Sequence, residues 1–137
     1  MKVVLDTNVW LDWLLFDDPR IAPLRAAVEA GTVEVVADDA CEAELARVLT
    51  YRFYRETLPP GDQARHLDVF RRSSNKLEIK KQTRPGTLRC ADPDDQKFLD
   101  LAVAAGAQAL LTRDEALLRL ARRAPFRILR PEELQLG

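Results

Sequence analysis

Four carboxylate side chains lie far apart in the chain but could meet at one metal site. They are Asp6, Glu44, Asp95 and Asp114. Carboxylate oxygens are the ligands that Mg²⁺ and Mn²⁺ favour in proteins, and such ions assist the hydrolysis of phosphodiester bonds. Carboxylates that lie close together repel one another unless a cation neutralises them. The residue types therefore predict a site for a divalent metal, provided that the fold brings the four residues together.

The pattern of the chain predicts a fold that can do so. Short runs of apolar and β-branched residues predict strands at 2–5, 32–37, 77–80, 108–112 and 126–129. Helical spacing predicts helices at about 9–15, 19–30, 62–73, 92–105 and 114–123, and a long helix from about 39 to just before Pro59. This order predicts a three-layer α/β/α sandwich with a mostly parallel central sheet of about five strands, in which 1–137 form a single domain.

The predicted topology places the aspartates at one edge of the sheet. In open parallel sheets the functional cleft lies beyond the carboxyl ends of the strands, near the point where the strand order reverses. Asp6 ends the first strand, Asp114 follows the strand at 108–112, and Asp95 lies in the first turn of the next helix. Each aspartate taken singly is better explained as a helix N-cap, but caps need not converge on one point. The shared placement of all three favours a metal site.

Two choices of ligand stay open at this point. Glu44 and Glu42 lie on opposite flanks of the apolar stripe of the same predicted helix, and their spacing does not choose between them. Asp92 precedes Pro93, a pattern typical of an N-cap followed by the first helical residue. Asp92 and its neighbour Asp94 are therefore second-choice ligands.

Composition excludes several other kinds of protein. The chain has 21 basic and 22 acidic residues, so it exerts no general attraction on nucleic acid, and binding must come from local basic groups or bound metal. Two cysteines without CxxC spacing and a single histidine do not suggest a zinc site or a disulfide framework. No apolar run is long enough to span a bilayer. We expect a cytoplasmic protein with free thiols and no membrane partner.

Four short segments carry a resemblance to a known family. They read VVLDTNV at 3–9, ELARVL at 44–49, DPDDQKFL at 92–99 with AAGA at 104–107, and LTRD at 111–114. In their order and separation these segments resemble the motifs of the PIN domain family, over essentially the whole chain.

The resemblance implies a metal-dependent nuclease. In such a protein the four carboxylates would coordinate one or two Mg²⁺ or Mn²⁺ ions, and Asn8 and Thr112 would support the site by hydrogen bonding. Many short PIN proteins are endoribonucleases similar to VapC, the toxin of a toxin–antitoxin pair, so the resemblance also implies an RNA substrate, a small antitoxin and a homodimer. Apolar bulk near the N-terminus favours a dimer as well, at Trp10, Trp13, Leu14 and Phe16.

One position departs from the family pattern. Arg113 stands where related chains often have glycine, so it could neutralise the site or contact a phosphate.

Three alternative functions compete with this one. A phosphatase of the haloacid-dehalogenase type needs a second aspartate two residues after the first, and Asn8 argues against it. The remaining alternatives are an inactive interaction module with the same fold, and a nuclease that processes RNA or cleaves DNA.

Overall fold

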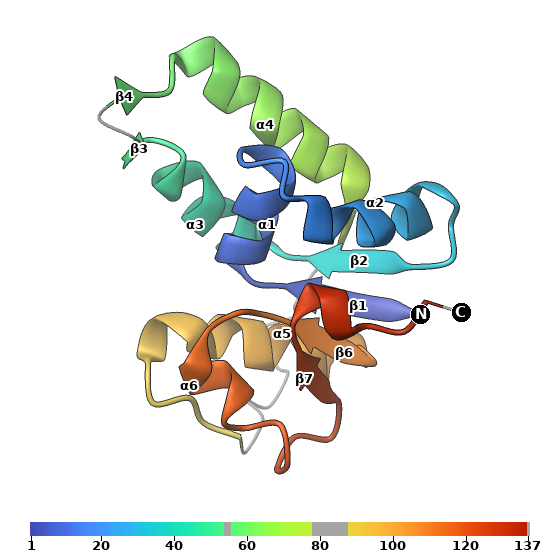
Figure 1. The fold of residues 1–137 in the computed structure, drawn as a ribbon. Helices are drawn as coiled ribbons and strands as arrows, with labels where there is room; N and C mark the ends of the chain where they lie inside the picture. The colour runs from blue at the N-terminus through green and yellow to red at the C-terminus, as the bar shows by residue number, and fades with distance from the viewer. Residues whose placement is uncertain (54–55, 78–87, 137) are drawn as a thin grey trace.

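A five-stranded sheet lies at the centre of the computed structural model, which describes residues 1–53, 56–77 and 88–136 (Figure 1). All of its strands are parallel, in the order β5-β2-β1-β6-β7. These strands are β1 (Lys2–Leu5), β2 (Glu34–Ala37), β5 (Asn75–Lys76), β6 (Ala109–Leu111) and β7 (Arg127–Leu129). The predicted sheet is thereby confirmed.

Helices cover both faces of the sheet, as Figure 1 shows. One face carries α1 (Thr7–Leu14), α2 (Ala22–Glu29), α3 (Asp39–Val48) and α4 (Pro60–Ser73), and the other carries α5 (Gln96–Ala105) and α6 (Glu115–Leu118). The 3₁₀ turns η1 (Pro19–Ile21), η2 (Pro93–Asp95) and η3 (Pro131–Glu133) join these elements. The three layers of the predicted sandwich are all present.

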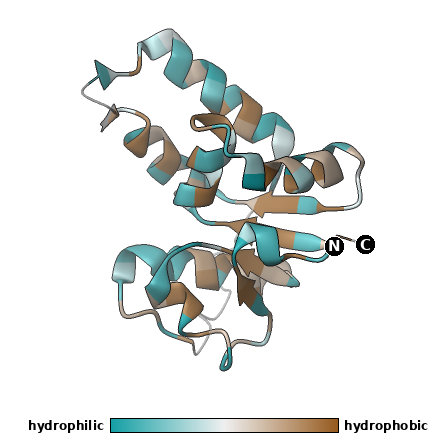
Figure 2. Cartoon of the chain, viewed as in Figure 1, coloured by the Kyte–Doolittle hydropathy of each residue, from teal (hydrophilic) through white to brown (hydrophobic). Residues whose placement is uncertain are grey.

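The core consists of two apolar clusters, one on each face of the sheet. Side chains alternate along a strand, so Val3 and Leu5 pack with α1 to α4, whereas Val4 packs with α5 and α6. The strands at the centre of Figure 2 are accordingly hydrophobic along most of their length. Because central parallel strands are buried on both faces, they read as continuous apolar runs, and the sequence marks them clearly.

Aromatic residues near the N-terminus belong to the first of these clusters. Trp10 and Trp13 are buried, and the Trp10 ring lies 5.2 Å from that of Trp13 and 4.7 Å from that of Phe70 between centroids. Phe16 is 40% exposed and contacts Phe53 edge-on. The two tryptophans that we expected to exceed the capacity of the core are thus absorbed by it, which removes them from the argument for a dimer.

The predicted long helix from residue 39 was wrong in its second half. Helix α3 ends at Val48, where the hydroxyl of Thr50 donates to the carbonyl of Arg47 at 2.6 Å and stops the helix. The chain continues into β3 (Arg52–Phe53) and β4 (Glu56–Thr57), which pair as an antiparallel ribbon. Threonine and aromatic residues favour extended structure, so Thr50 and Phe53 carried a signal against a continuous helix.

Two other elements differ from their predicted bounds. Strand β5 is Asn75–Lys76, earlier than the predicted strand at 77–80, and residues 78–80 lie outside the described part of the chain. Helix α6 ends at Leu118 and is followed by turns rather than by helix to residue 123. In the part of the chain that the structure describes, no helix combines the length and apolar character needed to cross a bilayer.

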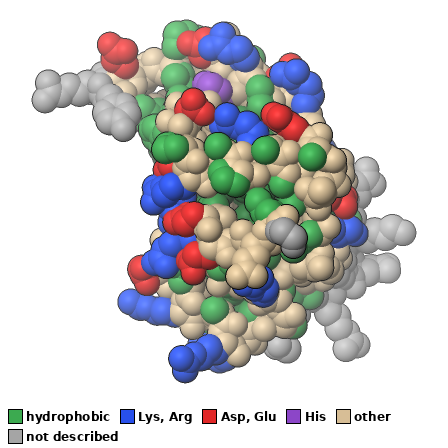
Figure 3. Space-filling model, turned by 45° about the vertical axis from the view of Figure 1, so that its right-hand side comes forward, with side chains coloured by type: hydrophobic (Ala, Val, Ile, Leu, Met, Phe, Trp, Pro, Cys, Tyr) green, Lys and Arg blue, Asp and Glu red, His purple; other side chains and the backbone are tan. Residues whose placement is uncertain are grey.

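Charged side chains of both signs are interspersed on the face that Figure 3 shows. Pairs such as Arg20 with Asp18 and Arg65 with Asp62 lie in contact at 2.7 Å. Such exposed pairs contribute little to stability, but they leave little unbalanced charge locally.

Candidate functional site

The candidate site lies at the carboxyl ends of β1 and β6. Leu5 and Leu111 are partners in the register of these two strands, so Asp6 and Thr112, which follow them, leave the sheet side by side. From β1 the chain continues to β2 on one side, while β6 lies on the other. The strand order reverses here, as expected for a functional cleft in an open parallel sheet.

Asp6 is a helix cap that also holds a second contact. One of its oxygens accepts the backbone N–H of Val9 at 2.9 Å, which caps α1, and the other accepts the hydroxyl of Thr112. The residue is only 3% exposed. Burial, with smaller contributions from the carboxylates of Asp114 and Asp12, raises the pKa of Asp6 to about 6 despite these hydrogen bonds. One oxygen of Asp6 thus serves as the helix cap, and the other makes the contact with Thr112.

Thr112 connects two of the four carboxylates. Its hydroxyl donates to Asp6 and accepts the backbone N–H of Asp114 at 2.9 Å, and the side chain is fully buried. Asp114 caps α6 by accepting the N–H of Ala116 at 2.8 Å. We predicted that Thr112 supports the site by hydrogen bonding, and this geometry supports that role.

Asp95 differs from the other aspartates because it caps nothing. It is the last residue of η2 and occupies the N-cap position of α5, but its side chain makes no capping hydrogen bond. Its Oδ2 atom is buried and receives no N–H or O–H from the described residues. Burial, followed by the adjacent Asp114 carboxyl group, raises the pKa of Asp95 to about 7, with smaller effects from Asp92 and Asp6. A buried carboxylate oxygen without a donor is unfavourable, so a proton shared with Asp114 or a bound cation would stabilise it.

The structure distinguishes Glu44 from Glu42. Glu44 faces a cavity of about 170 Å³, whereas Glu42 turns away and pairs with Arg71 of α4 at 3.0 Å. The cavity is lined by Asp6, Thr7, Asn8, Glu44, Val48, Asp95 and Phe98. Three of the four predicted ligands therefore face one cavity, and the backbone of the fourth, Asp114, is joined to Asp6 through the hydroxyl of Thr112.

Sequence reasoning missed two residues that hold Glu44. The hydroxyl of Thr7 donates to one oxygen of Glu44, and the ammonium of Lys97 lies 2.5 Å from the other. Lys97 also donates to the carbonyl of Asp94 at 2.7 Å. The available signal was chemical: a group of buried carboxylates requires a cation, and Lys97 is the basic residue nearest to Asp95 in the sequence.

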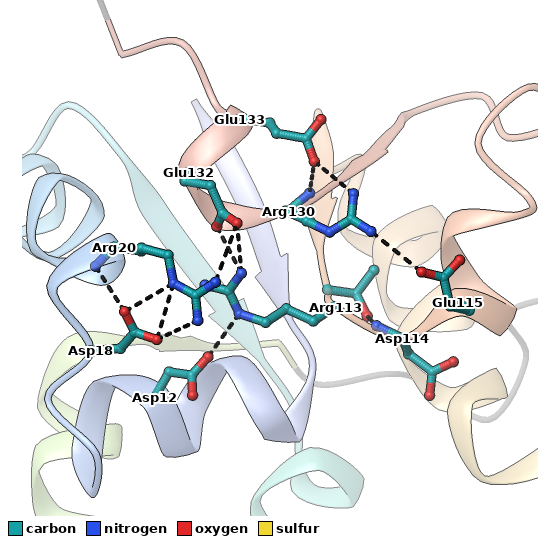
Figure 4. A network of polar contacts seen from close by, with 10 residues as sticks. Asp12, Asp18, Arg20, Arg113, Asp114, Glu115, Arg130, Glu132 and Glu133 are labelled. Atoms are coloured by element: carbon teal, nitrogen blue, oxygen red, sulfur yellow. Dashed lines mark hydrogen bonds and ion pairs between the residues drawn. The ribbon is translucent and has the colours of Figure 1, made fainter.

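Arg113 is engaged by two acidic residues outside the group of four carboxylates. Its guanidinium donates to Asp12 at 2.9 Å and to Glu132 of η3 at 2.7 Å. In Figure 4 the side chains of Arg113 and Asp114 extend in opposite directions, so the positive charge is directed away from the Asp114 carboxylate. Arg113 instead ties α1 to the C-terminal turn.

The remaining predicted residues, Asn8 and Asp92, do not contact the four carboxylates through hydrogen bonds of their side chains within the described residues, although Asn8 lines the cavity. Asn8 is exposed and makes no side-chain hydrogen bond to the described residues, so its expected supporting contact is not seen there. Asp92 caps η2 by accepting the N–H of Asp94 at 3.0 Å. Asp92 therefore fits the cap interpretation that we preferred for it.

The donor set suits a divalent ion by its chemistry. Every candidate ligand is a carboxylate, as Mg²⁺ and Mn²⁺ prefer, and the buried oxygen of Asp95 lacks a partner. Within the described ranges, however, no three side chains of His, Cys, Asp or Glu are close enough to share one ion. Both oxygens of Glu44 are occupied by Thr7 and Lys97. The residues thus suit a divalent ion by their chemistry, but to share one the carboxylates would have to move closer together, and Glu44 would have to leave its present partners.

Comparison with known proteins agrees with the fold. Residues 2–116 match the sequence model of the PIN domain family. The chain is also similar to a chain in the crystal structure of VapBC2 from Rickettsia felis bound to a DNA fragment from their promoter. That likeness has a TM-score of 0.67 and 18% identity, and covers 94% of this chain and 97% of the other. No curated protein sequence matches the chain. The predicted PIN-like sandwich is confirmed.

Proposed function

Because the chain belongs to the PIN domain family, we propose that it is a nuclease that hydrolyses phosphodiester bonds with the help of Mg²⁺ or Mn²⁺. We propose further that its substrate is RNA and that it acts in the cytoplasm. One observation carries this proposal. Three carboxylates from separate segments, Asp6, Glu44 and Asp95, line one cavity near the carboxyl end of β1, and one buried oxygen among them, Asp95 Oδ2, has no hydrogen-bond donor among the described residues.

Each side chain has a distinct part in this proposal. Asp6 and Asp114 are held rigidly, because each caps a helix and each contacts the buried hydroxyl of Thr112. Asp6 does so through its carboxylate, and Asp114 through its backbone N–H. Asp95 offers the free oxygen, and Glu44 faces it across the same cavity. We assign metal binding to these four residues. A divalent ion in such a site lowers the pKa of water and stabilises charge on phosphate oxygens.

A protein partner is the second part of the proposal. The similarity to VapBC2 supports the idea that this chain is the toxin of a toxin–antitoxin pair, whose small antitoxin blocks the site. The resemblance to VapC favours RNA over DNA as the substrate. We also retain the homodimer as a proposal; in the described ranges Phe16 and Tyr51 are exposed aromatic residues near the β3–β4 ribbon that could contribute to it.

A non-catalytic interaction module is the main competing function. The observation in its favour is that Glu44 is already satisfied by Thr7 and Lys97, so this half of the acidic group is stable without a metal. In that case the cavity would serve only to bind a protein partner. The two possibilities differ in whether the purified chain cleaves nucleic acid.

The deciding experiment is cleavage of single-stranded RNA by the purified chain, with Mg²⁺ or Mn²⁺ and with a chelator. We expect Asp95→Asn and Glu44→Gln to reduce the cleavage rate at least ~100-fold, as removal of a group that stabilises a transition state does. Glu42→Gln is the matched control, because Glu42 lies on the same helix but faces Arg71, and it should leave the rate within about threefold.

The controls also separate the alternatives. Parallel reactions with single-stranded DNA test the choice of substrate. Cleavage that survives the chelator, or full activity of Asp95→Asn, would refute the metal site that we propose. If the folded chain cleaves neither nucleic acid under any of these conditions, the interaction module is the better account.

A further inference from the structure

We propose that Lys97 is the built-in counter-ion of the acidic cavity. In this proposal its ammonium holds Glu44 while no divalent ion is bound, and it must release Glu44 before an ion can use that carboxylate. Lys97 thereby lowers the affinity of the site for metal. The inference rests on the proposed function, because it assumes that the cavity binds a divalent ion.

The contact between Lys97 and Glu44 is close and partly shielded from water. The two residues lie 53 positions apart, on α5 and α3, and the ammonium nitrogen is 2.5 Å from Glu44 Oε1. The side chain of Lys97 is 24% exposed and that of Glu44 is 12% exposed. Solvent and salt screen such a pair less than an exposed one, so its charge acts strongly on anything else that binds nearby.

Arg47 is a second cation near the Glu44 carboxylate, but it does not hold that carboxylate as Lys97 does. Its guanidinium lies 3.7 Å from the same oxygen of Glu44, but its side chain is 63% exposed. An exposed pair of this kind is worth little. Lys97 is also anchored by the carbonyl of Asp94 at 2.7 Å, so its ammonium is held at the rim of the cavity rather than free in solvent.

The acidic cavity is consequently divided into two halves. Both oxygens of Glu44 are in use, one by the hydroxyl of Thr7 and one by Lys97. On the other side, Asp95 Oδ2 is buried without a partner among the described residues. A divalent ion that enters beside Asp95 meets the positive charge of Lys97 across the cavity, and it gains Glu44 only by displacing that charge.

Displacement of Lys97 is physically reasonable. A lysine ammonium is a compact charge on a flexible stem of four carbons, and its second contact, the Asp94 carbonyl, lies in the exposed turn η2 just before α5. The side chain can therefore leave Glu44 without any change in the backbone. Loss of Lys97 should accordingly strengthen metal binding rather than weaken it.

Isothermal titration of the full chain with Mn²⁺ tests this inference independently of catalysis. We expect Lys97→Met to bind Mn²⁺ at least ~10-fold more tightly than the wild type, because the ion then gains the Glu44 carboxylate without displacing an ammonium held 2.5 Å from it. Arg47→Met is the matched control. It removes a charge near the same oxygen, and it should change the affinity by less than about threefold because that charge is exposed.

A second background shows whether the effect passes through Glu44. In a chain that carries Glu44→Gln, the carboxylate over which lysine and metal compete is absent, so adding Lys97→Met should change the affinity by less than about threefold. Circular dichroism confirms that each variant is folded. Lys97→Gln, which retains a polar side chain, replaces Lys97→Met if the latter does not fold.

The outcomes distinguish this inference from the proposed function. Saturable Mn²⁺ binding that is equal or weaker in Lys97→Met overturns the role of Lys97 and leaves the metal site in place. An equal gain in both backgrounds also overturns it, since the effect would then be a general one of net charge. If no variant and no wild-type protein binds Mn²⁺ saturably, both the inference and the metal site are refuted.

Discussion

Replacement of Asp6 by asparagine should stabilise the metal-free protein at neutral pH. Asp6 is 3% exposed, and burial raises its pKa from 3.8 to about 6. Asparagine is about as good an N-cap as aspartate, so its amide oxygen can still accept the N–H of Val9. Its amide nitrogen can donate to the hydroxyl of Thr112, which keeps a hydrogen bond at that position. The substitution therefore removes the charge while it preserves the contacts.

The size of the effect follows from the raised pKa. A pKa that is higher in the folded state means that folding favours the protonated form, so the stability contributed by this group is fully present below pH 3.8. It is lost as the pH rises through about 6. Each pKa unit corresponds to about 1.4 kcal/mol, and the whole shift to about 3 kcal/mol. The free energy of unfolding of Asp6→Asn should thus equal that of the wild type near pH 3.5 and exceed it by up to about 3 kcal/mol at pH 7.5.

Urea unfolding of both proteins in the presence of a chelator, at pH values between 3.5 and 7.5, measures this difference directly. The other carboxylates titrate in both proteins, so the difference between the two curves isolates Asp6. A variant that is less stable than the wild type at pH 7.5, or a difference that does not change with pH, would refute the reasoning. Mn²⁺ should stabilise the wild type more than the variant, because a bound ion needs the charge that asparagine lacks.

Three further predictions concern the residues around the site. Thr112→Val should lower the free energy of unfolding by about 1–3 kcal/mol, since it leaves a buried backbone N–H and a buried carboxylate without their partner; urea unfolding measures this loss, and an unchanged stability would contradict it. Arg113→Met should destabilise the fold by about 1–3 kcal/mol, because Asp12 and Glu132 lose their partner. It should leave the rate of RNA cleavage within about threefold. A larger loss of cleavage in the folded variant would show that Arg113 contacts the substrate. Binding of Mn²⁺ at pH 7 should release about half a proton, because the pKa of Asp95 is about 7; titrations in two buffers with different ionisation enthalpies measure it, and identical heats would argue against Asp95 as a ligand.

Local chemistry made the central fold predictable from the sequence. The buried parallel strands read as apolar runs, and residues with restricted or unusual backbone conformations mark the ends of helices. Gly106, for example, takes φ +62° where α5 ends, a left-handed conformation that glycine adopts without strain. Pro93 likewise follows the cap residue Asp92 at the start of η2. These signals depend only on neighbouring residues.

Contacts between side chains that are distant in the sequence could not be predicted in this way. The choice between Glu44 and Glu42 depends on Arg71 and Lys97, which approach α3 from two different helices. Arg113 is drawn away from the carboxylates by partners 101 and 19 positions distant in the chain. Sequence spacing does not encode such pairings, because they arise only once the layers pack.

Crystals of the wild-type protein grown with Mn²⁺, measured near the manganese absorption edge, test the central claim most directly. The anomalous signal of manganese locates the ion without any assumption about activity. Our account predicts a peak in the cavity at the carboxyl ends of β1 and β6, in contact with Asp95 and at least one of Asp6 and Asp114. Saturating Mn²⁺ with no peak at these residues, or with peaks only at surface carboxylates elsewhere, would contradict it.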